Sequence, residues 1–272
     1  MFRLVFTTLC IFLSTCLPIF APAGNLQESK AQLDAALMKA AEQDNAGEIK
    51  ALLGKGASPH AKGKLGWTPF MFVSLQNDVV SMRLLLRAGA DINATSADSD
   101  TPLMNASMLG RSRAVRTLLS MGAKVNTANK EGNTALSNAA IFSDDIVEML
   151  IKHGANVNKQ DSFGLTALIS ASAFPHGTTQ QDQQYYIRRL RVVRLLLNHK
   201  ADPNKQSNKG YTALMAASSH GNVEMVLELL KHGANVGAID RTGRSALEYA
   251  VARHQNEVVK LLTRQPKPRL HK

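Results

Sequence analysis

The 272-residue chain contains very little cysteine: Cys10 and Cys16, both near its start, are the only two. This scarcity excludes a disulfide scaffold, a cysteine-rich zinc site and a Cys-X-X-Cys redox centre. Aromatic residues make up only 5% of the chain, and glycine and proline are too few for a collagen-like or low-complexity protein. Basic residues exceed acidic residues by 32 − 21 = 11, so we expect attraction to polyanions, anionic lipid or acidic protein surfaces.

The first residues have the pattern of an export signal. One cation, Arg3, precedes an apolar run over residues 4–20, and small residues stand at positions 21 and 23. This pattern predicts a signal peptide over residues 1–23 that is cleaved before Gly24, with a short linker over residues 24–30. The run is shorter than the roughly 20 residues that a membrane-spanning helix needs. An uncleaved anchor, or a lipoprotein attached through Cys16, stays open as an alternative.

The expected compartment follows from what cleavage removes. Both cysteines leave with the signal, and a chain without thiols suits an oxidising compartment. Glycan-acceptor sequences begin at Asn93 and Asn105, but the second lies within a predicted helix, where a glycan is hard to place. These features favour export in a bacterium, so we expect the protein in the periplasm.

One repeated unit accounts for most of the chain. A motif of the general form Gly-x-Thr-x-Leu recurs with its last apolar residue at positions 70, 103, 136, 168, 214 and 247, giving spacings of 33, 33, 32, 46 and 33. A second motif, Gly-Ala followed by Asn or Asp, recurs with the same spacings. The Thr suits a helix N-cap, the Gly suits a helix C-terminus, and the Asn residues suit the turn that follows. Each unit is therefore predicted to be a helix–turn–helix.

The two motifs resemble the ankyrin repeat, whose period is about 33 residues. The resemblance covers residues 31–264 and implies an all-α solenoid of about seven helix–turn–helix units with short β-turn fingers. The expected units are about residues 31–63, 64–96, 97–129, 130–161, 162–207, 208–240 and a cap over 241–264. The histidine of the family's Thr-Pro-Leu-His motif is missing throughout, so packing is expected to replace its hydrogen bond. Lys200 replaces the closing glycine of the fifth unit, at a cost of up to about 1 kcal/mol if positive φ is kept there.

Two segments lie outside the period. The fifth unit holds 46 − 33 = 13 extra residues, placed between Phe174 and about Ile187. Residues 175–179 are predicted to form a loop, and residues 180–198 an extended second helix. Residues 265–272 are predicted to be a basic, disordered tail.

Catalytic and metal-binding motifs are missing from the sequence. His153, His199 and His232 share one position in the unit, at a helix end where the dipole favours them. We therefore expect no enzyme activity, no cofactor and no metal. A catalytic function hidden in the insertion is disfavoured, because only His176 and Asp182 there suit acid–base chemistry.

An ankyrin-type solenoid implies a concave surface that binds a protein. Large apolar residues stand before several helix caps and at the ends of first helices, positions expected to face solvent. We predict that a stripe of them lines the groove of units three to five, namely Met108, Leu109, Ile141, Phe142, Leu165 and Phe174, flanked by Trp67 and Tyr211. Partner contact is expected to concentrate in such aromatic anchors. The alternative is that these side chains pack between helices or fold under the insertion.

The extended helix supplies a second candidate surface. It carries four arginines with no acidic residue among them: Arg188, Arg189, Arg191 and Arg194. We expect them to attract an acidic partner or, weakly, an anionic membrane surface, and the alternative is a merely solvated helix face. Nucleic acid is not an expected partner, because the sequence contains no recognised nucleic-acid-binding module.

Together these features indicate an exported monomer that holds an unidentified partner protein. The chain resembles the small signal-bearing ankyrin proteins of bacteria, some of which support a periplasmic enzyme, and this resemblance implies a role as adaptor or protector. The alternative is a secreted or surface-associated host-interaction factor that uses the basic insertion and tail.

Overall fold

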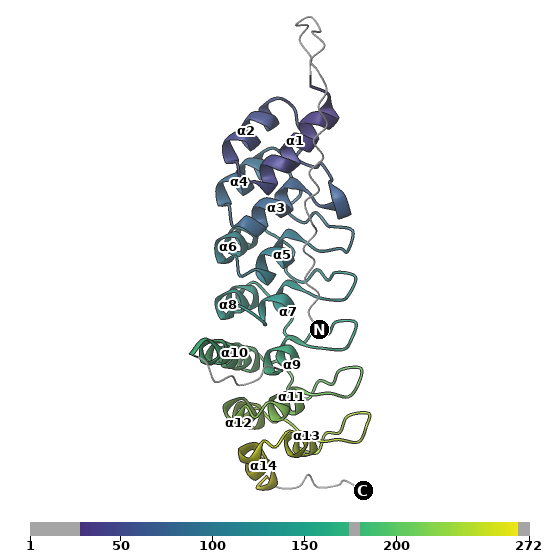
Figure 1. The fold of residues 1–272 in the computed structure, drawn as a ribbon, viewed down its shortest axis with the longest axis vertical. Helices are drawn as coiled ribbons and strands as arrows, with labels where there is room; N and C mark the ends of the chain where they lie inside the picture. Colours follow the sequence, from purple (N-terminus) through teal and green to yellow (C-terminus); the bar gives the residue numbers. More distant parts are fainter. Residues whose placement is uncertain (1–27, 174–179, 266–272) are drawn as a thin grey trace, which may run out of the picture.

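The structure is a computed structural model that describes residues 28–173 and 180–265, and these form an elongated stack of helix pairs (Figure 1). The first helices of the pairs are α1 (Lys30–Glu42), α3 (Pro69–Gln76), α5 (Pro102–Met108), α7 (Ala135–Ala139), α9 (Ala167–Ser172), α11 (Ala213–Ser219) and α13 (Ala246–Ala252). The second helices are α2 (Ala46–Gly54), α4 (Val79–Arg87), α6 (Ser112–Ser120), α8 (Asp144–Lys152), α10 (Gln180–Asn198), α12 (Val223–Lys231) and α14 (Asn256–Thr263).

The two sets of helices form two columns, and loops that we call fingers project beyond the column of first helices (Figure 1). Each finger connects one pair, or repeat, to the next. Over the residues that the structure describes, extended pairing is limited to two isolated bridges, Gln160 with Thr166 and Ile239 with Ser245. The predicted all-α repeat solenoid is confirmed.

Threonine starts the first helix of five repeats. The Oγ1 atoms of Thr68, Thr101, Thr134, Thr166 and Thr212 each accept the backbone N–H three residues on, at 3.2–3.4 Å. Such a cap is typically worth about 0.5–2 kcal/mol. Where the ankyrin motif has His, Met71, Met104, Ile169 and Met215 are fully buried. Packing replaces the missing hydrogen bond at these four positions, as predicted. At Ser137 and Glu248 the prediction is wrong, because these side chains accept the backbone N–H groups of Thr134 and Ser245.

Buried aliphatic side chains run continuously through the stack. They come from the facing sides of both columns, and examples are Phe70, Leu85, Leu118, Ile146 and Leu229, all with no exposed surface. Burying a side chain of this size contributes about 1.5–3 kcal/mol. One helix pair has no second layer of its own, so this burial depends on the neighbouring pairs.

Asparagine side chains join successive repeats. The Oδ1 atoms of Asn93, Asn126, Asn158 and Asn204 accept backbone N–H groups of the next repeat, from Lys124, Asn156, Asp202 and Asn235, at 2.7–2.8 Å. The side-chain nitrogens of the last three also donate to the carbonyls of Gly154, Lys200 and Gly233 at 2.9–3.1 Å. The sequence predicts that these residues build the turn that leads to the next unit. In the structure their side chains also bridge the two units.

Backbone hydrogen bonds also connect the fingers. One N–H of each finger donates to a carbonyl of the finger before it: Ala97 to Leu65, Lys130 to Asp98, Ser162 to Glu131, Asn208 to Phe163 and Arg241 to Lys209, at 2.7–3.0 Å. The approach is close at Gly164, where φ is +74° and an added Cβ would lie 2.6 Å from the backbone nitrogen of Asn208. Only glycine fits there without displacing the next finger.

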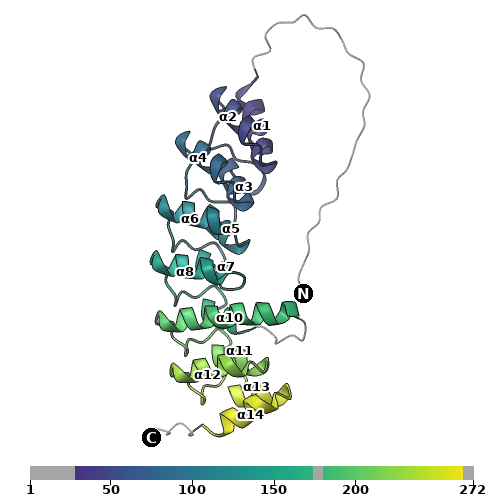
Figure 2. The same cartoon turned by 90° about the vertical axis from the view of Figure 1, so that its left-hand side faces the viewer.

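The insertion lengthens one helix of the second column. Helix α10 spans the predicted residues 180–198 and extends beyond its neighbours (Figure 2). The Tyr186 hydroxyl in its added part donates to the Glu224 carboxylate at 2.5 Å, and burial raises the pKa of Tyr186 above its usual range. The insertion therefore packs against the next repeat as a helix.

Several predicted segments lie outside the described residues: the signal peptide over residues 1–23, the predicted loop over residues 175–179, and all of the tail except Gln265. Ser29 caps α1 together with Gln32, so the last residues of the predicted linker belong to the first helix. No helix in the described ranges is long and apolar enough to cross a membrane.

The asparagine bridges lead to a test at Asn158. We expect Asn158→Ala to lower the free energy of unfolding by about 1–2 kcal/mol, because two inter-repeat hydrogen bonds worth about 0.5–1.5 kcal/mol each are lost. Urea unfolding followed by circular dichroism measures this loss. Asn156→Ala is the control, since that side chain accepts the N–H of Asn158 within its own finger. Equal losses in the two variants would contradict the bridging role.

A second test concerns Lys200, which has φ +66° at the position where other repeats have glycine. A left-handed conformation costs a residue with a side chain roughly 1 kcal/mol. We expect Lys200→Gly to raise the free energy of unfolding by up to about 1 kcal/mol. The gain is reduced because glycine gives the unfolded chain more conformational entropy. The reverse change at the next repeat, Gly233→Lys, should lower it, because Gly233 has φ +83°. Thermal melts of both variants check the opposite signs.

Candidate functional site

The residues predicted to form one apolar stripe occupy separate places. Met108, Leu109, Ile141 and Phe142 line one cavity, while Leu165 and Tyr211 line another that shares no residue with the first. Trp67 lines neither cavity, and Phe174 lies outside the described residues. The prediction of one continuous stripe is therefore wrong. The first cavity lies at the turns between paired helices, whereas the second lies between fingers and first helices.

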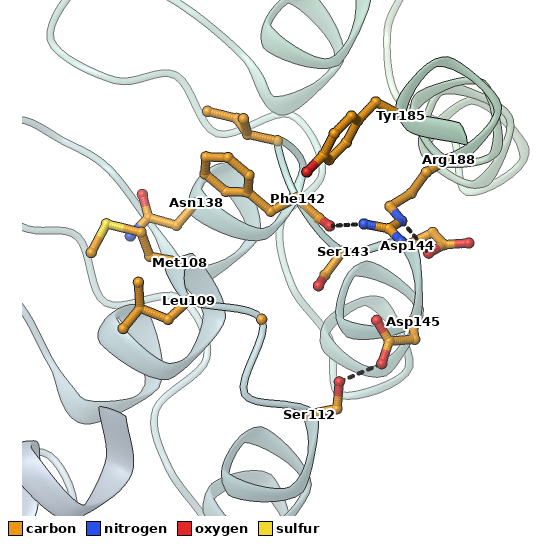
Figure 3. A pocket seen from close by; sticks show the side chains of 12 residues that line it. Met108, Leu109, Ser112, Asn138, Phe142, Ser143, Asp144, Asp145, Tyr185 and Arg188 are labelled. Carbon is orange, nitrogen blue, oxygen red and sulfur yellow. Dashed lines mark hydrogen bonds and ion pairs between the residues drawn. The ribbon is translucent and has the colours of Figure 1, made fainter. Parts of the chain in front are cut away.

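The first cavity, which we call the turn groove, has a volume of about 1060 Å³. Met108 and Leu109 at the end of α5 form one wall, Phe142 of the α7–α8 turn lies at the floor, and Tyr185 of α10 stands opposite (Figure 3). Ile141 of the same turn also lines the groove. The remaining lining residues are Gly110, Ser112, Asn138, Ser143, Asp144, Asp145 and Arg188. Three consecutive repeats thus contribute to the groove.

The side chains of the turn groove are only half covered. Met108, Leu109 and Phe142 are 43%, 45% and 44% exposed, whereas Ile141 is partly buried. The alternative of full burial between helices therefore does not hold for these three residues. Exposed apolar residues gathered in a concave site are typical of binding surfaces.

Polar contacts fix the rim of the turn groove. The Arg188 guanidinium donates to the carbonyl of Phe142 at 3.2 Å and lies 3.8 Å from the Asp144 carboxylate (Figure 3). At the adjacent Asp145, the Ser112 hydroxyl donates to the carboxylate at 2.5 Å (Figure 3). These contacts join α10 to α8 and α6 to α8, so they hold the three repeats in register around the groove.

The arginines of α10 do not form the free basic patch that the sequence suggests. Arg188 and Arg191 pair with Asp144 of α8 at 3.8 and 3.5 Å, and Arg194 pairs with Glu228 of α12 at 2.8 Å. The acidic partners come from the helices on either side, which the local sequence does not reveal. Exposed pairs of this kind are worth at most about 1 kcal/mol each, so they balance charge more than they stabilise.

The prediction that Arg189 contacts a partner is also corrected. Its side chain is only 7% exposed and donates to the carbonyl of Ser170 at 3.1 Å. Its burial lowers the pKa of Arg189 to about 10. Arg189 therefore packs α10 against α9 and is not available to a partner.

The second cavity, which we call the finger groove, has a volume of about 640 Å³. It is lined by Phe163, Leu165, Ser207, Asn208, Lys209, Tyr211, Asp240, Arg241, Thr242, Arg244 and Tyr249. The residues before the helix caps were expected to face solvent, but Leu165 and Tyr211 here, like Trp67 near the start of the stack, are half-buried. They fold back onto first helices instead.

Two of the residues that precede helix caps pack on the side chain five residues later in the chain. Trp67 packs on Phe72 with ring centres 5.2 Å apart, and the Arg244 guanidinium lies 4.6 Å from the centre of the Tyr249 ring. After Tyr211 the same position holds the small Ala216, and Tyr211 reaches the Tyr249 ring of the next repeat at 5.2 Å, edge to face. This spacing could have indicated the packing in advance.

Asp240 is the electrostatic centre of the finger groove. Its carboxylate accepts hydrogen bonds from the Tyr249 hydroxyl at 2.6 Å and from Thr242 and Arg244 at 2.7–2.9 Å. These hydrogen bonds hold the pKa of Asp240 well below its usual range, and the bond from Tyr249 has the largest effect. Burial and the Asp240 carboxylate together raise the pKa of Tyr249 to about 12.

Four residues that matter at the two grooves were not predicted: Tyr185, Phe163, Tyr249 and Asp240. Phe163 occupies a finger position held by Leu65, Asp98 and Glu131 in other repeats, so an apolar residue there was a usable signal. His153 and His232 end helices as predicted, each with Nδ1 2.8–2.9 Å from a carbonyl of the last turn. Across the described part of the chain, no group of three His, Cys, Asp or Glu side chains could hold a metal ion.

A stack of helix pairs with grooves along its sides is the architecture of a helical-repeat protein. A family model described as ankyrin repeats, in three copies, matches residues 37–129, 122–178 and 185–270. The chain therefore belongs to the ankyrin repeat family. Ankyrin repeats are generic protein–protein interaction modules and are typically not catalytic. Among curated proteins, none matches this chain.

The low pKa of Asp240 leads to a pH-dependent prediction. Because the folded pKa lies below the unfolded value, the ionised carboxylate contributes stability that is present above about pH 4 and is lost as the pH falls towards the folded pKa. We expect Asp240→Asn to melt several degrees below the wild type at pH 7, and the difference to shrink by pH 3. Melting temperatures at both pH values test this. Asp91→Asn, at an exposed finger carboxylate that accepts the N–H of Asn93, is the control, and a pH-independent difference for Asp240→Asn would contradict the prediction.

Proposed function

We propose that this chain is an exported, non-enzymatic monomer that binds a partner protein at the turn groove and acts as adaptor or protector of a periplasmic enzyme. The observation that carries the binding proposal is the half-exposed apolar set of Met108, Leu109 and Phe142, which two adjacent repeats bring into one cavity. The export proposal rests on the signal pattern of residues 1–23.

The geometry of the groove suits a protein ligand. Its volume exceeds that of one side chain, and its apolar floor is bordered by Arg188, Asp144 and Asp145 at the rim. Interfaces commonly combine an apolar centre with a polar rim, and the centre supplies most of the affinity. Membership of the ankyrin repeat family supports the same function.

The pairing of the α10 arginines bears on the second candidate, a host-interaction factor that uses the basic insertion. Arg188, Arg191 and Arg194 already contact carboxylates of α8 and α12. An acidic surface would have to compete with those contacts, so we place the partner on the apolar floor of the turn groove.

The test is a comparison of matched surface variants. Met108→Ser with Phe142→Ser removes two exposed apolar side chains from the turn groove, and Val80→Ser with Leu227→Ser removes similarly exposed residues from second helices. Each protein, immobilised without its signal segment, captures proteins from periplasmic extract at low salt, and quantitative mass spectrometry compares the bound sets. We expect at least one protein to be retained by the wild type and the control pair and to fall at least tenfold with the groove pair.

Two outcomes would contradict the proposal. One is a bound set that does not differ between the groove pair and the wild type. The other is a large fall in melting temperature of the groove pair, above about 10 °C, because it would assign Met108 and Phe142 to the core and not to a binding surface.

A further inference from the structure

We propose that the finger groove is a second binding site and that it takes an acidic peptide segment of a partner protein, anchored by one aromatic or other large apolar side chain. The proposal shares with the proposed function only the premise that the protein binds other proteins. The site itself is different, because the finger groove is built by repeats five to seven and the turn groove by repeats three to five.

The apolar half of the finger groove offers a place for one large side chain. Tyr211 and Tyr249 meet edge to face at 77°, Leu165 lies beside them half-buried, and Phe163 on the neighbouring finger is 65% exposed. A phenyl ring left this exposed at the edge of a cavity loses contact with water when an apolar side chain enters. The volume of about 640 Å³ lies in the range of sites that hold ligands of this size.

The charged half of the groove is positive. Lys209, Arg241 and Arg244 are exposed along it. The groove is also lined by the carboxylate of Asp240. This carboxylate is buried, and its oxygens accept hydrogen bonds from Tyr249, Thr242 and Arg244. Within the described ranges, no carboxylate lies at ion-pair distance from Lys209 or Arg241. These two cations are therefore open to an anionic partner, unlike the arginines of α10, and charge complementarity selects acidic residues.

The backbone of the fingers limits how a partner can bind. The N–H groups of Asn208 and Arg241 already donate to the preceding fingers, so the peptide cannot add to these fingers as a further strand through those groups. Recognition must come from the side chains. The two tyrosine rings are half-buried and edge to face, so they do not present the parallel faces on which successive nucleic-acid bases stack. An acidic peptide fits the groove better than a nucleic acid.

The test selects binders from a displayed library of random 12-residue peptides on the purified protein. We expect the selected peptides to be enriched in Asp and Glu around one Phe, Trp, Tyr or Leu. Their fluorescein-labelled forms should bind at least tenfold more weakly to Lys209→Glu with Arg241→Glu, and also more weakly to Phe163→Ser. The matched control is Lys50→Glu with Arg83→Glu on α2 and α4, which makes the same change in net charge on exposed residues and should leave the affinity unchanged.

Several results would overturn the proposal. They are a selection that yields no binder at 10 µM, peptides without acidic enrichment, or peptides whose affinity the finger variants do not change. Peptides that lose affinity with Phe142→Ser but not with the finger variants would overturn this inference and support the turn groove. Binding of a labelled 20-nucleotide poly-dT as tight as that of the best peptide, and equally weakened by Lys209→Glu with Arg241→Glu, would assign the groove to nucleic acid instead.

Discussion

A helix pair of this protein cannot cover its own apolar side, and the rest of the structure depends on that constraint. Leu85, Leu118, Ile146 and Leu229 reach full burial because neighbouring pairs pack against them. The stacking must be accurate, since a small shift would misalign each layer of side chains. The asparagine bridges and the finger-to-finger hydrogen bonds supply that accuracy. The bridges bind an asparagine side chain to the backbone of the next repeat, and the finger bonds join the two backbones directly. Apolar burial provides the attraction, and these polar contacts determine the register.

The same stacking explains why the surface has grooves. Adjacent repeats are held by short contacts at the asparagine bridges and the fingers, while the helix turns and the cap-preceding residues lie between these contacts. Large side chains at these places, such as Phe142 and Tyr211, line cavities that span several repeats. The side chains that line the grooves therefore differ from repeat to repeat, whereas the contacts that stack the repeats recur along the chain.

Periodicity was sufficient to predict whatever every repeat shares. The threonine caps, the paired helices, the bounds of α10 and the strained Lys200 all follow from comparing one unit with the next. The candidate sites were predicted less well, because they depend on contacts between units. Arg191 and Asp144 lie 47 residues apart in the chain, and no local pattern shows that α10 and α8 bring them together. Likewise, Tyr211 contacts Tyr249 of the next repeat, 38 residues further along the chain, and no local pattern indicates that contact.

The length of α10 has a consequence for how the stack comes apart. In a solenoid each unit contacts only its neighbours, so opening normally starts by fraying at either end and proceeds one unit at a time. Helix α10 reaches Asp144 in the repeat before it and both Glu224 and Glu228 in the repeat after it. The Tyr186 hydrogen bond adds to the packing that every second helix makes with its neighbours, so we expect these three repeats to behave as one cooperative block at the centre of the rod. Both grooves draw walls from this block, so their shapes should persist while the terminal repeats open and close.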